Sequence, residues 1–171
     1  FEASVTNLTD TANQADYLMI THADFKESIA PLKQYYEKKG LKEMIIDVED
    51  VYDEFNYGIS SPHAVKDFLQ YTYSKWRRPA PTYVLLVGDA HYDYRDNLKT
   101  GRPLYMPAYL IQNTPYQGET ASDNWFACLD GDTDILPDML IGRFPVRTKQ
   151  EADSLVHKTI EYSDQPLAAY N

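Results

Sequence analysis

The sequence has little cysteine, little glycine and no long apolar run. Its single cysteine, Cys128, excludes a disulfide within the chain. Only 7 of the 171 residues are glycine, and no Gly-x-Gly-x-x-Gly or Walker sequence follows the first predicted strand. No apolar segment approaches the length of a membrane-spanning helix. These absences argue against an internally disulfide-bonded domain, an ordinary nucleotide-binding fold and a membrane-spanning protein.

Basic residues are scarce as well, with 16 lysines and arginines against 26 aspartates and glutamates and a net charge of -10. Nucleic-acid binding requires basic patches against phosphate, so this balance disfavours a nucleic-acid partner. Charged residues at 25% and aromatic residues at 13% are typical of one globular domain. Because the chain begins at Phe1 rather than Met, we interpret it as a piece of a longer precursor.

The apolar pattern predicts alternating strands and helices. Their order indicates an α/β fold of three layers, with a mostly parallel, flavodoxin-like sheet of four to five strands and helices on both faces. Ligand sites of such sheets lie beyond the carboxyl ends of the strands. The long stretch 90–122 carries one strand-like piece and is typical of a functional loop. Strands are expected at 15–21, 42–48, 82–89, near 109–111, in 124–129 and in 138–146, and helices at 28–39, at 61–76 and after a Thr148–Glu151 capping box.

A cysteine nucleophile needs a base within reach. Cys128 lies in NWFACL between Ala127 and Leu129, which is the setting of a buried core cysteine. His22 and His91 follow predicted strand ends, where a solvated or capping histidine is the more ordinary interpretation. The residues alone therefore favour a structural role for Cys128.

The stretch DGDTDILPD, residues 130–138, contains four aspartates. Hard cations such as Ca²⁺ bind several oxygens at about 2.3–2.6 Å, and Gly131 permits the bend that would turn carboxylates toward one point. The EF-hand pattern is incomplete, because its twelfth position has no glutamate and no flanking helices are predicted. The spacing leaves a metal loop and a solvated turn open, and gives little support to an acid/base pair.

Three longer segments resemble the gingipain family of cysteine endopeptidases, which have a caspase-like fold. The segments are ITHADFKESIAPLKQYYEKKGLK, PTYVLLVGDAHYDYRDN and ETASDNWFACLDGDTDILPDMLIGRFPVRT. In this family the catalytic histidine and cysteine belong to the second of two α/β subdomains. This chain has no His-Gly pair, and Cys128 does not occupy the family's nucleophile position. The resemblance implies a lead-in at 1–14, the N-terminal, non-catalytic subdomain at 15–163, and the start of a linker at 164–171.

The resemblance also implies a function. The subdomain would pack against and support the catalytic subdomain of the same precursor, a secreted or cell-surface bacterial endopeptidase of protein or peptide substrates. The isolated chain would be inactive, since the dyad lies outside it. One alternative is a non-enzymatic calcium-binding or interaction scaffold from a precursor without the dyad. Another is a free-standing flavodoxin-like binding domain with a ligand near His22 and Asp89.

Finally, the resemblance implies a structural calcium ion at the acidic stretch. This chain has one more residue between Gly131 and Asp134 than the family pattern, so Asp132 is an alternative to Asp134. The implied ligands are the side chains of Asp89, Asp134 and Asp138 and the backbone carbonyls of Asp130 and Leu136.

Overall fold

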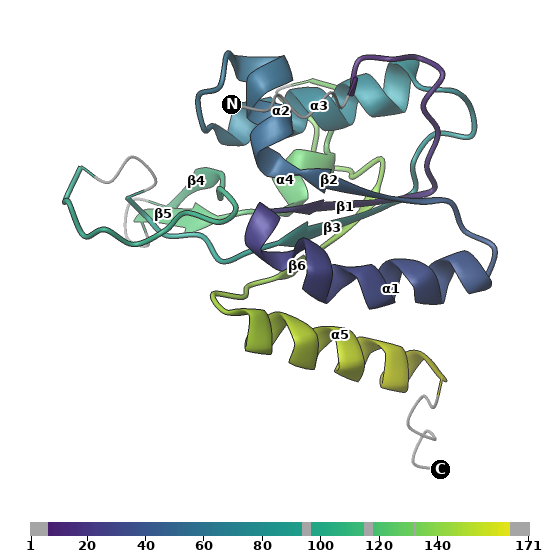
Figure 1. Cartoon of the computed structure of the whole chain (residues 1–171). Helices are drawn as coiled ribbons and strands as arrows, with labels where there is room; N and C mark the ends of the chain where they lie inside the picture. Colours follow the sequence, from purple (N-terminus) through teal and green to yellow (C-terminus); the bar gives the residue numbers. More distant parts are fainter. Residues whose placement is uncertain (1–6, 94–96, 115–117, 132, 165–171) are drawn as a thin grey trace, which may run out of the picture.

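The computed structural model describes residues 7–93, 97–114, 118–131 and 133–164. Its centre is one parallel sheet with the strand order β2-β1-β3-β6 (Figure 1). The predicted α/β fold with a mostly parallel sheet is confirmed, with four strands in this sheet. These strands are β1 (Tyr17–Thr21), β2 (Glu43–Asp47), β3 (Tyr83–Val87) and β6 (Leu140–Phe144).

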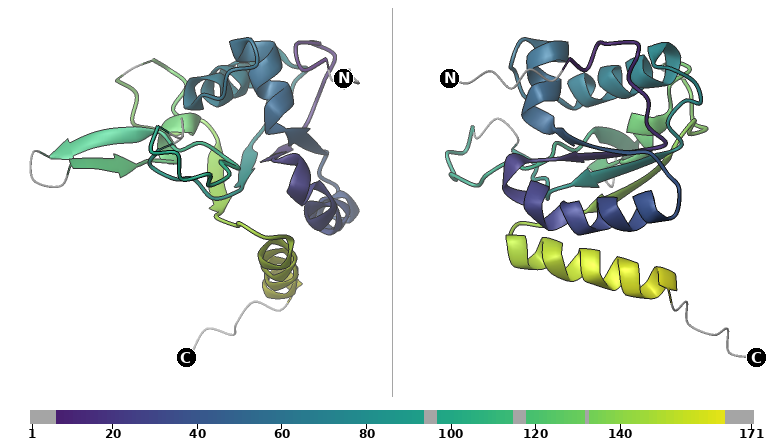
Figure 2. Two further views of the ribbon diagram at one scale, coloured as in Figure 1. Left: turned by 60° about the vertical axis from the view of Figure 1, so that its left-hand side comes forward. Right: turned by 45° about the vertical axis from the view of Figure 1, so that its right-hand side comes forward.

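Helices cover both faces of the sheet, as the views in Figures 1 and 2 show. Alternate residues of the central strands enter different cores: Leu18 and Ile20 pack on one face, whereas Met19 packs on the other. Both faces are buried, which explains why these strands read as continuous apolar runs. The helices α1 (Lys26–Lys38) and α5 (Lys149–Asp164) lie on one side, and α2 (Val48–Asn56), α3 (Pro62–Lys75) and α4 (Asn124–Ala127) on the other.

The helix starts that the sequence predicts are present. The Ser61 hydroxyl accepts the N–H of His63 at 3.2 Å, and Pro62 occupies the first helical position of α3. Before α5, the Thr148 N–H donates to the Glu151 carboxylate and the Glu151 N–H donates to the Thr148 hydroxyl, both at 3.2 Å. The predicted capping box is therefore confirmed.

Two short α-helices, α2 and α4, were not predicted. Helix α2 begins at the last residue of the strand predicted at 42–48 and continues into the stretch before the helix predicted at 61–76. It buries Val48, Val51 and Tyr52, and Asp47 accepts the N–H of Glu49 as its cap. Its apolar stripe has only about two turns, too few to stand out among its acidic residues. Helix α4 replaces the strand expected in 124–129, because one helical turn is too short to reveal a helical period.

A two-stranded antiparallel hairpin of β4 (Leu110–Thr114) and β5 (Gly118–Ala121) projects from the body of the molecule (Figures 1 and 2). The strand-like piece near 109–111 predicted the start of β4. Strand β5 is exposed throughout and has no apolar alternation, so the sequence carried no signal for it.

Residues 7–14, expected as a loose lead-in, are instead fixed to the helices of one face. Leu8 is buried, and its carbonyl accepts the indole N–H of Trp76 at 2.9 Å. The Glu54 carboxylate accepts the backbone N–H groups of Leu8 and Thr9 at 2.9 and 3.2 Å. In the part of the chain described here, no helix is long and apolar enough to cross a membrane.

Candidate functional site

The acidic stretch between α4 and β6 folds back on itself. Asp130, Asp134 and Asp138 each offer one carboxylate oxygen, and these oxygens lie within 4.8 Å of one another. Two oxygens on opposite sides of a calcium ion are at most about 5.2 Å apart, twice the longest usual ligand distance. The donor set, three carboxylates, is the kind that hard cations prefer. These three residues therefore fit a calcium ion.

Backbone N–H groups hold two of these carboxylates in place. Asp134 accepts the N–H of Leu136 at 3.0 Å and the N–H of Asp130 at 3.1 Å, one on each oxygen. Asp138 accepts the N–H of Leu129 at 3.0 Å. The N–H donors of Leu136 and Asp130 hold the pKa of the Asp134 carboxyl below its usual range. Asp134 is thus charged and oriented by the fold of its own loop.

The structure brings together only part of the predicted ligand set. Asp89 is not a member of this group, and its carboxylate pairs with the Arg147 guanidinium at 2.5 Å. Asp130 contributes a side-chain oxygen to the group, whereas the prediction used its backbone carbonyl. The roles of Asp89 and of the Asp130 and Leu136 carbonyls stay predictions, and Asp132 lies outside the described residues.

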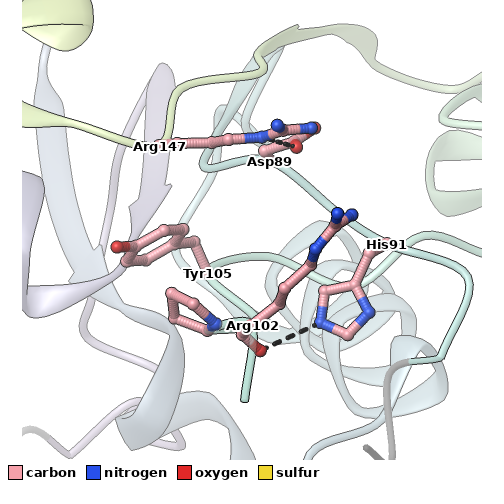
Figure 3. Close-up of a pocket in the computed structure, with 6 residues that line it drawn as sticks. Asp89, His91, Arg102, Tyr105 and Arg147 are labelled. Atoms are coloured by element: carbon pink, nitrogen blue, oxygen red, sulfur yellow. Dashed lines mark hydrogen bonds and ion pairs between the residues drawn. The ribbon is translucent and has the colours of Figure 1, made fainter. Parts of the chain in front are cut away.

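Asp89 and Arg147 meet because they follow neighbouring strands. The ladder between β3 and β6 extends past both strand ends, with the N–H of Gly88 donating to Phe144 at 2.9 Å and that of Asp89 to Val146 at 2.8 Å. A cavity of about 210 Å³ lies beside the pair, at the carboxyl edge of the sheet where ligand sites of such folds gather (Figure 3). It is lined by Asp89, His91, Arg102, Pro103, Tyr105 and Arg147.

The residue between β3 and Asp89 has to be a glycine. Gly88 has a φ of 135°, and a Cβ at this position would lie 2.6 Å from the Cβ of Tyr105. Tyr105 itself packs on the rings of Phe25 and His22, with centroids 4.8 and 5.3 Å apart. The missing side chain of Gly88 therefore allows the long loop to return across the strand ends and form the wall of the cavity.

Arg143, on β6, is a positioning residue that the sequence reasoning passed over. Its guanidinium donates to both carboxylate oxygens of Asp123 at 2.8–3.0 Å. It also donates to the carbonyls of Gly88, Met106 and Pro107 at 3.0, 3.3 and 2.9 Å. A lone arginine inside the strand LIGRF, with an aspartate upstream in SDNW, is the signal that could have found it.

The cysteine has the environment of a core residue. Cys128 is 2% exposed and its thiol donates to the Asn124 carbonyl at 3.3 Å. Burial raises the pKa of this thiol, which opposes formation of a thiolate. No histidine of the described chain hydrogen-bonds to it; His22 instead accepts the N–H of Asp24 at 3.2 Å and caps a short 3-10 helix, Ala23–Phe25.

The sequence as a whole matches one family. The model of peptidase family C25 matches residues 10–171. The chain belongs to this family. Its membership confirms the gingipain relationship that the three sequence segments predicted. A search of curated proteins gave no match.

Two solved structures share the fold. A crystal structure of dimeric latent PorU from Porphyromonas gingivalis matches with a TM-score of 0.74 and 25% identity, covering 93% of this chain and 17% of that one. A structure described only as a protease matches with a TM-score of 0.62 and 21% identity, covering 95% of this chain and 31% of that one. The chain thus spans less than a third of the length of either relative, and it combines a peptidase family C25 sequence with a PorU-like fold.

Proposed function

We propose that this chain is the N-terminal, non-catalytic subdomain of a gingipain-like cysteine endopeptidase. The observation that carries the proposal is the state of Cys128. In a family of cysteine peptidases, the only cysteine of this sequence is buried and bonded to Asn124, and among the described residues no histidine hydrogen-bonds to it. A cysteine nucleophile needs a nearby base and an accessible thiolate, and Cys128 has neither.

The contribution of the chain to proteolysis is then structural. The subdomain packs against the catalytic subdomain of the same protein and supports it, while a histidine–cysteine dyad elsewhere in the protein attacks the scissile carbonyl. The full-length protein acts on protein or peptide substrates, outside the cell or at the surface of a bacterium.

The test of this function is a comparison of the isolated chain with the longer protein. We expect thiol-dependent peptide cleavage by the longer protein and none by the isolated chain. Cys128→Ala in the longer protein should leave its activity unchanged. Cleavage by the isolated chain that disappears in Cys128→Ala contradicts the proposal. A longer protein without thiol-dependent activity would favour the alternative, a non-enzymatic calcium-binding or interaction scaffold.

The acidic loop would hold a structural calcium ion in this subdomain. The support is the convergence of the Asp130, Asp134 and Asp138 carboxylates. When bound, the ion would neutralise their mutual repulsion and fasten the loop between α4 and β6. A ligand that binds only the folded state raises the melting temperature by mass action. If neither excess EDTA nor added calcium shifts the melting temperature, the calcium site is absent.

A further inference from the structure

The cavity at the carboxyl edge carries charges that the proposed scaffold role does not use. Arg147 is already paired with Asp89, so the charges of these two residues cancel. The Arg102 guanidinium has no carboxylate partner among the described residues. Among the aspartate and arginines of the lining, Asp89, Arg102 and Arg147, one positive charge is in excess, on a chain whose net charge is -10.

The lining residues are held in position by the fold. The His91 imidazole and the Arg102 carbonyl oxygen are 3.2 Å apart, and this contact holds these two lining residues next to each other. Figure 3 shows the Arg102 side chain directed toward the side where Arg147 pairs with Asp89, next to the His91 ring. Tyr105, fixed against Phe25, and Pro103 provide the less polar part of the wall.

Size and charge together select the ligand. A cavity of about 210 Å³ is smaller than the roughly 300–1,000 Å³ of sites for drug-sized ligands and nucleotides. One uncompensated guanidinium matches a monoanion better than a phosphate dianion, and its planar fork matches the two oxygens of a carboxylate. We propose that this cavity binds a single carboxylate on a short carbon chain. The Arg102 guanidinium would donate hydrogen bonds to the carboxylate, with Arg147 as a second donor.

Such a carboxylate has two sources, an acidic side chain of a polypeptide and a free carboxylic acid. The probes are therefore the capped peptide acetyl-Gly-Glu-Gly-amide, its Gln counterpart and sodium acetate, titrated into ¹⁵N-labelled chain at low ionic strength in excess EDTA. We expect the Glu peptide or acetate to shift the backbone amide signals of Asp89, His91, Arg102 and Tyr105. Binding of the peptide assigns the site to polypeptides, and binding of acetate alone assigns it to free acids; both support a carboxylate site.

The decisive variant is Arg102→Gln, which removes the unpaired guanidinium from an exposed position. Loss of one charge-assisted bond should weaken carboxylate binding by about tenfold or more. The matched control is Arg77→Gln, at an exposed arginine between α3 and the start of β3, which should leave binding unchanged. The proposal fails if Arg102→Gln binds like the wild type, if the Gln peptide binds as tightly as the Glu peptide, or if inorganic phosphate binds more tightly than either carboxylate.

Discussion

Arg143 and Asp123 form a two-pronged ion pair between β6 and the start of α4, with the Arg143 Nε atom 3.0 and 2.9 Å from the two Asp123 carboxylate oxygens. The rest of the guanidinium donates to three backbone carbonyls of β3's end and the long loop. One side chain therefore joins the sheet, the helix α4 and the wall of the carboxyl-edge cavity. Replacing the Arg143 guanidinium should therefore loosen the contacts of the sheet, of α4 and of the cavity wall together.

Arg143→Lys should destabilise the protein by about 2–4 kcal/mol, since an ammonium group cannot reproduce the fork and leaves buried acceptors without donors. The change in the urea midpoint measures this loss. Arg147→Lys is the control, because the Arg147 side chain is 69% exposed against 11% for Arg143. A surface substitution of this kind should change stability by no more than about 0.5 kcal/mol. Equal midpoints for the two variants would refute the organising role of Arg143.

Gly88→Ala should destabilise the fold by about 2–4 kcal/mol, because the new methyl group meets the Tyr105 side chain and an alanine is strained at this positive φ. Gly101→Ala tests the backbone contribution alone: Gly101 also has a positive φ, of 64°, but a Cβ there meets nothing within 4 Å. It should cost only about 1 kcal/mol. Thermal unfolding measures the stability of the two variants. Similar losses of stability would show that the contact with Tyr105 is unimportant.

Asp134→Asn and Asp138→Asn should each weaken or abolish the rise in melting temperature caused by calcium, because each removes a charged ligand from the group. Asp153→Asn, at an exposed position on α5, removes one negative charge without touching the loop. It should keep the full response to calcium. Titration calorimetry with calcium provides the second measurement. Wild-type calcium affinity in both loop variants would place the ion at another site.

The lowered pKa of Asp134 predicts a pH dependence of stability in the absence of calcium. Since its folded pKa lies below the unfolded value of about 3.9, its stabilising contribution is present above that pH and is lost as the pH falls through the folded pKa. Urea midpoints in excess EDTA, from about pH 6 to about pH 2, should therefore fall more steeply for the wild type than for Asp134→Asn. Parallel profiles would show that the N–H groups of Leu136 and Asp130 do not favour the charged carboxylate.

Much of the fold was determined by local sequence. The runs around the central strands β1 and β3 are almost continuously apolar because both faces of the sheet are buried there, so these strands could be predicted from the residues alone. The helix N-cap at Ser61 and the capping box at Thr148 are local hydrogen-bond patterns, so they could also be predicted from the sequence. Helices α2 and α4 escaped prediction because a period cannot be seen in one or two turns.

The sites depend on neighbours that the sequence does not reveal. The stretch DGDTDILPD showed many acids, but only the folded loop selects Asp130, Asp134 and Asp138 as a group and leaves Asp89 with Arg147. The pair Asp89–Arg147 requires β6 to lie beside β3, as it does in the order β2-β1-β3-β6. The pair Asp123–Arg143 requires the start of α4 to pack against β6. Residue spacing along a chain fixes which side chains share a face of one element. Only the packing of whole elements decides which charges meet across the sheet, because those distances depend on strand order and on how far the long loop returns.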